Sequence, residues 1–304
     1  MSRKKSSHQL FLSQKRQIFS DYICLLKPRV MSLVVFTAIS GLLVAPHNLS
    51  ILQAIISILS ITIGAGASGA LNMWYEADRD KLMKRTCKRP LPMGRISRTG
   101  ALLFGSILAI LSVFSLGYFL NYLAALLLAF TIFFYVVIYT IWLKPRTPQN
   151  IVIGGAAGAF PPLVAWVSAT GDISIMPILL FLIIFLWTPP HFWALSLYTV
   201  QDYDKANIPM LPNVKGINYT KKYILIYSIL MSITAIMPAI IADAKIYYAI
   251  ASFILGIIFI IKAIYLYQEK NPNKITLQAK SLFKYSLIYL FLIFLILLFD
   301  HYLK

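Results

Sequence analysis

Acidic residues are scarce in this sequence. Ten Asp and Glu residues stand against 28 Lys and Arg residues, and the four charged types together make up only 12% of the chain. A soluble domain usually carries about 25% charged residues. Hydrophobic residues reach 59% instead. The composition therefore excludes an ordinary soluble globular protein and indicates an integral membrane protein.

Cysteines and the common motifs of soluble enzymes are also few or absent. The two cysteines, Cys24 and Cys87, lie in basic segments that we expect on the reducing side of the membrane, so we expect free thiols and no disulfide. The sequence has no Walker-type loop, no dinucleotide-binding glycine pattern, no HExxH and no Cys/His metal spacing. Its four histidines do not suggest a Ser-His-Asp arrangement.

Long apolar runs dominate the rest of the chain. A helix needs about 20 apolar residues to cross a hydrocarbon core of about 30 Å, and unpaired backbone groups are too costly in lipid for an open, non-helical span. The apolar runs are about 30–46, 51–75, 100–118, 122–143, 150–168, 174–199, 222–242, 246–268 and 283–299. We therefore predict an all-α, polytopic membrane protein. A basic N-terminal segment, 1–29, precedes a single domain, 30–300, formed by a bundle of nine transmembrane helices.

The net charge of +18 follows the predicted topology. All Lys and Arg residues except Lys245, Lys262 and Lys304 lie in the N-terminal segment or in every second loop. This positive-inside pattern places the N-terminus in the cytoplasm, and it argues against nucleic acid as a partner. We expect a multi-pass protein, surrounded by membrane lipid, in a bacterial plasma (inner) membrane, or in the mitochondrial inner membrane if the source is eukaryotic.

Two loops on the predicted inner face are unusually long. Residues 77–98 and 200–221 carry prolines at defined places and no low-complexity sequence, so we predict ordered, functional loops. Small residues elsewhere are typical of close helix packing. Gly154 and Gly158 have GxxxG spacing, and we interpret both as packing positions.

Five of the ten acidic residues fall in two short stretches at the inner ends of predicted spans. Glu76, Asp78 and Asp80 form the first stretch, and Asp202 and Asp204 form the second. Ionisable residues at a membrane boundary are functional candidates. Because both spans end at the same face, we expect the two stretches to converge on one site.

Asn72, Glu76 and Asp80 are spaced by four residues. On a helix of 3.6 residues per turn each step of four advances only about 40°, so the three side chains line one face. Hard oxygen ligands suit Mg²⁺, which takes one or two carboxylates together with water and substrate phosphate. The alternative is a solvated helix end whose acids balance nearby bases. That alternative leaves Asn72, one turn inside an apolar helix, without a role.

A cluster of basic residues follows the first acidic stretch at once. It contains Lys81, Lys84, Arg85, Lys88 and Arg89. Arg and Lys side chains bind the diphosphate oxygens that a metal leaves free, although the positive-inside pattern alone also predicts bases here. Arg85 and Arg89, one turn apart, favour the diphosphate interpretation.

One histidine lies inside a predicted span. His191 is about three turns from the inner end of the sixth run and close in sequence to Trp187 and Trp193. A lone intramembrane histidine is often a satisfied packing residue, and contact with a substrate is the alternative. The sequence leaves both open.

Several motifs together resemble a known family. Asn72-x-x-x-Glu76-x-x-x-Asp80, followed by Arg85, Arg89-Pro and Gly94, resembles the signature of the intramembrane UbiA-type prenyltransferases. Lys27-Pro-Arg29 and the run from Pro190 through Asp202 to Pro212 resemble the haem-farnesylating branch of that family. The resemblance covers about residues 27–216. The sequence departs from the family where Met73, Glu76 and Ala206 replace frequent aspartates.

The resemblance implies an activity and a site. The activity is transfer of a farnesyl group from farnesyl diphosphate to a vinyl group of haem B, a substrate, with Mg²⁺ as the divalent cation. The implied metal ligands are Asn72, Glu76, Asp80, Asp202 and Asp204, and the first four would act in catalysis. The implied substrate contacts are Lys27, Arg29, Arg85, Lys88, Arg89, His191 and Trp193. A haem A synthase or terminal oxidase assembly proteins are the implied protein partners.

Other functions stay open at this point. A related prenyltransferase would act on a quinone precursor or on chlorophyllide. A secondary transporter would also have broken helices and charged residues near the midplane, but here the acids cluster at one face. A non-catalytic haem-handling protein would keep His191 and would have no need for the row of Asn72, Glu76 and Asp80.

Overall fold

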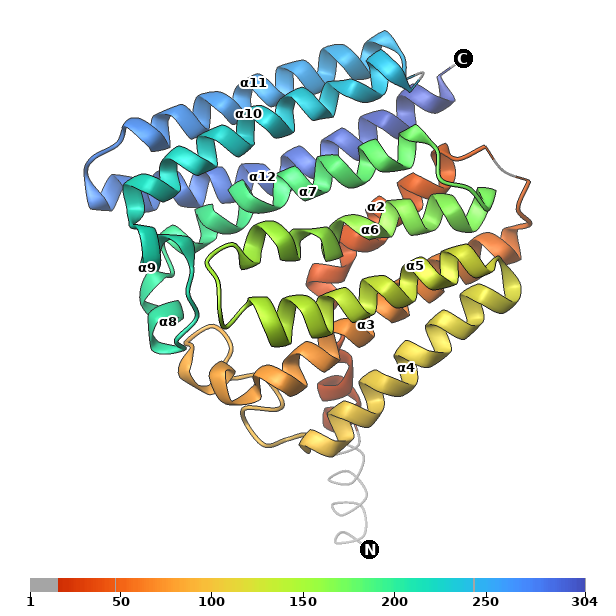
Figure 1. Cartoon of the computed structure of the whole chain (residues 1–304), viewed down its shortest axis with the longest axis horizontal. Coiled ribbons are helices and arrows are strands. Elements are labelled where there is room, and N and C mark those ends of the chain that lie inside the picture. Colours follow the sequence, from red (N-terminus) through yellow and green to blue (C-terminus); the bar gives the residue numbers. More distant parts are fainter. Residues whose placement is uncertain (1–15, 47, 243, 304) are drawn as a thin grey trace, which may run out of the picture.

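The computed structural model describes residues 16–46, 48–242 and 244–303, and within these ranges every regular element is a helix. The long helices lie side by side in a bundle (Figure 1). They are α2 (Pro28–Val44), α3 (Ile51–Leu82), α4 (Arg98–Phe119), α5 (Tyr122–Phe133) continued by the π-helix η1 (Phe134–Leu143), α6 (Asn150–Thr170), α7 (Ile175–Leu197), α10 (Ile217–Ile241), α11 (Ile246–Gln268) and α12 (Pro272–Tyr302). Two short helices, α8 (Val200–Lys205) and α9 (Leu211–Lys215), lie between α7 and α10.

The bundle confirms the predicted multi-pass membrane fold. Among the described residues, eight helices are long and apolar enough to cross a membrane. The helix α2, with 17 residues, meets the same criterion only together with the preceding helical segment Arg16–Leu25, from which it is bent by 52°. Large apolar side chains remain exposed along the outer helices, for example Ile110 on α4 and Phe253 on α11. Such a surface is suited to lipid rather than to water.

Polar caps explain where several helices begin. The side chain of Ser50 accepts a hydrogen bond from the Gln53 backbone and completes a capping box at the start of α3. Ser97 and Asn121 cap α4 and α5 in the same way. The sequence placed the end of this second span near residue 75, but α3 continues to Leu82. The loop that follows therefore starts at Met83, later than the expected 77.

This extra length keeps the acidic row helical. Asn72, Glu76 and Asp80 all lie on the last turns of α3 and all are buried. The loop after α3 and the short helices α8 and α9 lie near one another at one end of the bundle (Figure 1). The ends of the spans therefore bring the two predicted loops to the same face.

The glycines of α6 differ in what surrounds them. A Cβ on Gly154 would overlap the ring of Tyr139, and a Cβ on Gly155 would lie 2.9 Å from Thr188. These two glycines allow η1 and α7 to approach α6 closely. Gly158, in contrast, has no atom within 4 Å of the position of a Cβ, and it faces a cavity. The packing interpretation therefore fits Gly154 and not Gly158.

Candidate functional site

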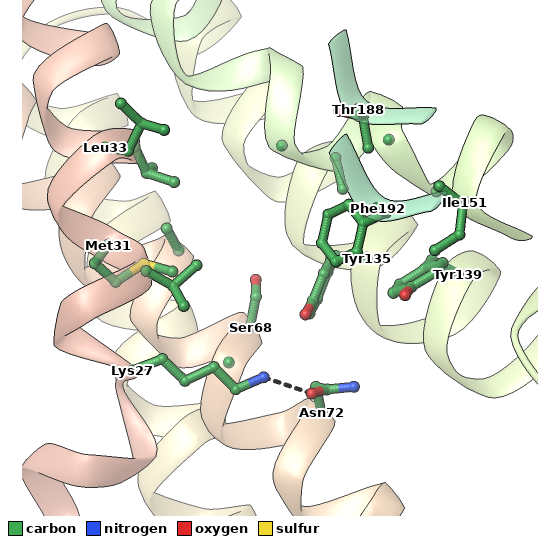
Figure 2. A pocket seen from close by; sticks show the side chains of 18 of the residues that line it. Lys27, Met31, Leu33, Ser68, Asn72, Tyr135, Tyr139, Ile151, Thr188 and Phe192 are labelled. Carbon is green, nitrogen blue, oxygen red and sulfur yellow. Dashed lines mark hydrogen bonds between the residues drawn. The ribbon is translucent and has the colours of Figure 1, made fainter. Parts of the chain in front are cut away.

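A cavity of about 510 Å³ lies among α2, α3, α5, η1, α6, α7 and α12. Its wall has two kinds of chemistry. Lys27 and Asn72 lie at one end, and apolar side chains such as Leu33 and Ile151 line the rest, with Tyr135 between them (Figure 2). A charged end joined to an apolar chamber suits an amphiphilic substrate with an anionic head and a hydrocarbon tail.

The charged end is built on α3. Asn72, Glu76 and Asp80 line the cavity, and each is only 3% exposed. Because a buried carboxylate without a partner is very costly, each polar group in this row should have a counterpart. The structure supplies one base for each member of the row.

Three bases from three different segments contact the row. Lys27 Nζ donates to Asn72 Oδ1 at 2.6 Å (Figure 2). Lys144 Nζ donates to Glu76 Oε2 at 2.6 Å, and Arg89 Nη1 donates to Asp80 Oδ2 at 2.8 Å. The three bases outnumber the two carboxylates, so the charged end has a net positive charge that would attract an anion.

Asn72 is fixed by its amide group. Its Nδ2 donates to Glu76 Oε2 at 2.9 Å and to Thr140 Oγ1 at 3.2 Å, while Thr140 Oγ1 donates to the carbonyl of Tyr135 at 2.8 Å. Thr140 belongs to η1, in which carbonyl and donor are five residues apart. The π-helix therefore orients the amide so that Asn72 Oδ1 faces the cavity beside Lys27.

Electrostatics differ between the two lysines. Burial opposes the charge on Lys144, but the adjacent Glu76 carboxylate more than compensates and raises the pKa of Lys144. Burial, and then the positive charge of Arg89, lower the pKa of Lys27 to about 7. Without an anion, Lys27 is thus close to losing its proton at neutral pH. A bound diphosphate would favour its charged form.

The row fits a magnesium ion. Glu76 Oε1 is buried and accepts no hydrogen bond within the described structure, although Lys144 Nζ is 2.5 Å away. No group of three Cys, His, Asp or Glu side chains among the described residues could hold a metal alone. Two carboxylates and an amide oxygen nevertheless match what Mg²⁺ takes from a protein when phosphate and water supply its other ligands.

The predicted basic contacts are only partly brought together. Lys27, Arg29, Arg85 and Arg89 line the cavity. Lys88 is exposed and does not line it. Lys144 was not among the predicted contacts and counted only as one of the basic residues of the predicted inner loops. It follows η1 directly, and the turn of the chain there brings its side chain into contact with Glu76. The only sequence signal for a role of Lys144 was its position in a loop on the same predicted face as the acidic row.

The second loop contributes other residues than the ones predicted. Asp202 is partly buried and Asp204 is exposed, and neither lines the cavity. Tyr203, Ile208 and Met210 line it instead. A metal-binding role for the two acids therefore stays a prediction.

The predicted aromatic contacts are divided in a similar way. His191 lines the cavity, whereas Trp193 is fully buried and packs edge-on against Tyr227, with ring centroids 5.4 Å apart. Tyr135 and Tyr139 of η1 line the cavity next to the row, and no sequence pattern predicted their role. Their placement depends on the π-helical turn and on the space left by Gly154.

The fold and the site together define a class. The chain matches the UbiA prenyltransferase family over residues 33–299. Because this match covers most of the chain, the protein belongs to the UbiA prenyltransferase family. The helical bundle of the described residues is thus that of an intramembrane prenyltransferase.

Close relatives carry a more specific name. The chain is 57% identical to a protohaem IX farnesyltransferase of Bartonella henselae, over 95% of this chain and 92% of that protein. It is 55% identical to a protohaem IX farnesyltransferase of Brucella ovis, over 92% of this chain and 90% of that protein. The relatives support the haem-farnesylating branch over the other branches of the family.

Solved structures of lower identity share the fold. A digeranylgeranylglyceryl phosphate synthase superposes with a TM-score of 0.77 at 20% identity, over 94% of this chain and 99% of that one. A UbiA homologue of Archaeoglobus fulgidus bound to DMAPP and Mg²⁺ gives a TM-score of 0.66 at 18% identity, over 90% of this chain and 99% of that one. At these identities the likeness extends to the fold alone.

Proposed function

We propose that this protein transfers a farnesyl group from farnesyl diphosphate to a vinyl group of haem B, with addition of water, to give haem O and diphosphate. The observation that carries the proposal is the buried row of Asn72, Glu76 and Asp80, contacted by three bases, at the end of an apolar cavity. The relatives' shared name supports haem as the acceptor.

The bases bind and activate the leaving group. Lys27, Arg89 and Lys144 contact the row at the charged end of the cavity, within reach of a diphosphate bound there, and Arg85 also lines the cavity. Positive charge positioned before the reaction stabilises the charge that develops on a leaving group, and such stabilisation is often the largest catalytic contribution. The bond between farnesyl C1 and oxygen breaks, and diphosphate leaves with the electron pair.

The row would hold the divalent cation. We propose Asn72, Glu76 and Asp80 as the protein ligands, with Lys27, Lys144 and Arg89 moving from them to the diphosphate. Mg²⁺, when bound, neutralises charge on the leaving diphosphate without a proton transfer. Asp202 and Asp204 remain further candidate ligands.

The wall next to the row would protect the farnesyl cation. Tyr135, Tyr139 and Phe192 line the cavity there, and the faces of aromatic rings attract positive charge. The terminal carbon of a haem vinyl group forms a bond to farnesyl C1, which leaves positive charge on the inner vinyl carbon. Water adds to that carbon and releases a proton, and the product is a hydroxyethylfarnesyl side chain.

We further propose the cellular setting. The positive-inside pattern supports a cytoplasmic N-terminus, and the bacterial relatives support a bacterial inner membrane. Haem O carries a new farnesyl tail and remains lipid-soluble, so a membrane enzyme must take it up. A haem A synthase or a terminal oxidase assembly protein would be such a partner.

A product assay tests the proposed function. Purified protein in lipid is mixed with haem B, farnesyl diphosphate and Mg²⁺, and the pigments are identified by mass spectrometry. We expect a haem whose mass has increased by one farnesyl group and one hydroxyl group. If haem stays unchanged while a quinone precursor is prenylated under the same conditions, the proposed acceptor is wrong and the family assignment stands.

A further inference from the structure

His191 is held in a slot of aromatic rings on the cavity wall, within the last two turns of α7. Trp187 stacks on the imidazole with ring centroids 4.2 Å apart and planes 18° apart. Phe283 of α12 also stacks on it, at 4.6 Å and 25°. Phe192 meets it edge-on at 5.2 Å. Because rings stack against the imidazole, its edge is the part best placed to face the cavity.

One hydrogen bond determines which nitrogen carries the proton. His191 Nδ1 lies 2.6 Å from Ser286 Oγ, and Ser286 Oγ donates to the carbonyl of Phe283 at 2.7 Å. A hydroxyl has a single proton to donate. Both contacts are hydrogen bonds only if Ser286 donates to the carbonyl and accepts from Nδ1, which then carries the ring proton. Nε2 of the neutral ring then has a free lone pair.

The support for this arrangement comes from a second helix. Trp187 Nε1 donates to the backbone carbonyl of Ser286 at 2.8 Å, so α7 and α12 are joined at the same residue that orients the imidazole. Nε2 itself makes no hydrogen bond to the described residues, while His191 lines the cavity. An acceptor nitrogen is therefore available to a ligand in the cavity.

A free imidazole lone pair can accept a proton or bind a metal. The surroundings disfavour protonation, because a protonated ring would be a buried charge stacked on Trp187 and Phe283, with no ion pair to a carboxylate of the described residues. The surroundings favour metal binding, because a metal-binding histidine usually donates its other N–H to a fixed acceptor. Iron in haem is commonly bound by a histidine.

We propose that His191 Nε2 is an axial ligand of the iron of the haem substrate, and that Ser286 is a positioning residue that fixes the tautomer. This inference rests on the proposed function, since it takes haem as the acceptor. Coordination at the iron would anchor the centre of the porphyrin in the cavity. The vinyl groups at its edge would remain free to react.

The test uses purified full-length protein in lipid, titrated with haem B alone and followed by optical and resonance Raman spectroscopy. We expect a histidine-ligated spectrum with an iron–histidine stretching band in the ferrous state. His191→Gly should lose the band and bind haem B more weakly, and added imidazole should restore the ligated spectrum. An unchanged band and unchanged affinity in His191→Gly would overturn the proposal.

Ser286 provides a second test that does not require removal of the histidine. Ser286→Ala should keep a ligated spectrum, shift the iron–histidine band and weaken haem binding by about 10- to 100-fold. Ser286→Thr retains the hydroxyl and should behave like the wild type. If the band in Ser286→Ala does not move, Ser286 does not position the ligand.

The product assay separates the two claims. Wild-type protein that makes farnesylated haem, but whose haem B spectrum does not depend on His191, would refute iron ligation and leave the proposed function intact. Wild-type protein that shows the histidine-dependent spectrum, but prenylates only another acceptor, would support iron ligation and refute the reaction.

Discussion

The two long loops at one end of the bundle look alike in sequence and differ in structure. Both follow a span, both contain prolines and both have acids near their start. The loop after α3 presents charged residues to the cavity, Arg85 and Arg89 among them, whereas the loop after α7 presents Tyr203, Ile208 and Met210. The first loop adds charged side chains to the cavity wall, and the second adds an aromatic and two apolar side chains.

The cause of the difference is where the preceding helix ends. The helix α3 continues through its acids to Leu82, so Glu76 and Asp80 share the helix face that turns toward the cavity. The helix α7 ends at Leu197, before Asp202, which lies on the separate short helix α8. Acids gain a defined direction from a continuous helix. A cluster of acids in sequence does not predict that direction by itself.

The largest expected effect concerns the acidic row. Asp80→Asn removes a carboxylate that lines the cavity, and we expect prenyl transfer to fall by about 1,000-fold. Asp78→Asn is the matched control two residues away. Asp78 is exposed and pairs with Arg98 and Lys81, so its rate should change by less than about twofold. The measurement is the initial rate of product formation, and equal losses in both variants would show that the row has no special role.

The next effect compares two lysines. Lys144→Met removes the partner of Glu76 and one diphosphate-binding charge, so we expect the rate to fall by about 100-fold. Lys88→Met removes a lysine that the sequence predicted as a contact but that lies off the cavity wall, and it should change the rate by less than about threefold. Steady-state kinetics with varied farnesyl diphosphate measure both. A larger loss in Lys88→Met would mean that the loop after α3 rearranges on binding.

A smaller effect is expected in the second loop. Asp202 does not line the cavity, so Asp202→Asn should lower the rate by less than about fivefold, far less than Asp80→Asn. Rates measured across a range of Mg²⁺ concentrations show how much Mg²⁺ each variant requires. If Asp202→Asn raises the Mg²⁺ requirement as much as Asp80→Asn does, the second loop also binds the metal and the contrast between the loops is lost.

The smallest effect concerns how the first loop is held. Arg95 Nε donates to both carboxylate oxygens of Asp21, at 2.9 and 3.1 Å, and so connects the loop to the helical segment before α2. The pair is partly exposed, and Arg95→Met should lower the free energy of unfolding by about 1 kcal/mol or less. Thermal unfolding in lipid measures this change in stability, with Arg146→Met as the control at an exposed arginine. A loss of several kcal/mol would mean that the loop depends on this pair.

The sequence predicted the parts of the molecule that depend on local patterns. Apolar runs located the spans, and the spacing of Asn72, Glu76 and Asp80 predicted a row on one helix face. Lys144 and Ser286 could not be predicted as partners, because they lie 68 and 95 residues from Glu76 and His191. The positions of Tyr135 and Tyr139 depend on a π-helical turn for which the sequence has no reliable signal.

The central claim is that the α3 row holds the metal–diphosphate complex. The most direct measurement is the affinity of the purified protein for a non-reactive farnesyl diphosphate analogue, titrated with and without Mg²⁺ in the wild type, Asp80→Asn and Asp202→Asn. We expect Mg²⁺ to strengthen binding in the wild type and in Asp202→Asn, and to have little effect in Asp80→Asn. If Mg²⁺ strengthens binding equally in Asp80→Asn, the row does not hold the metal.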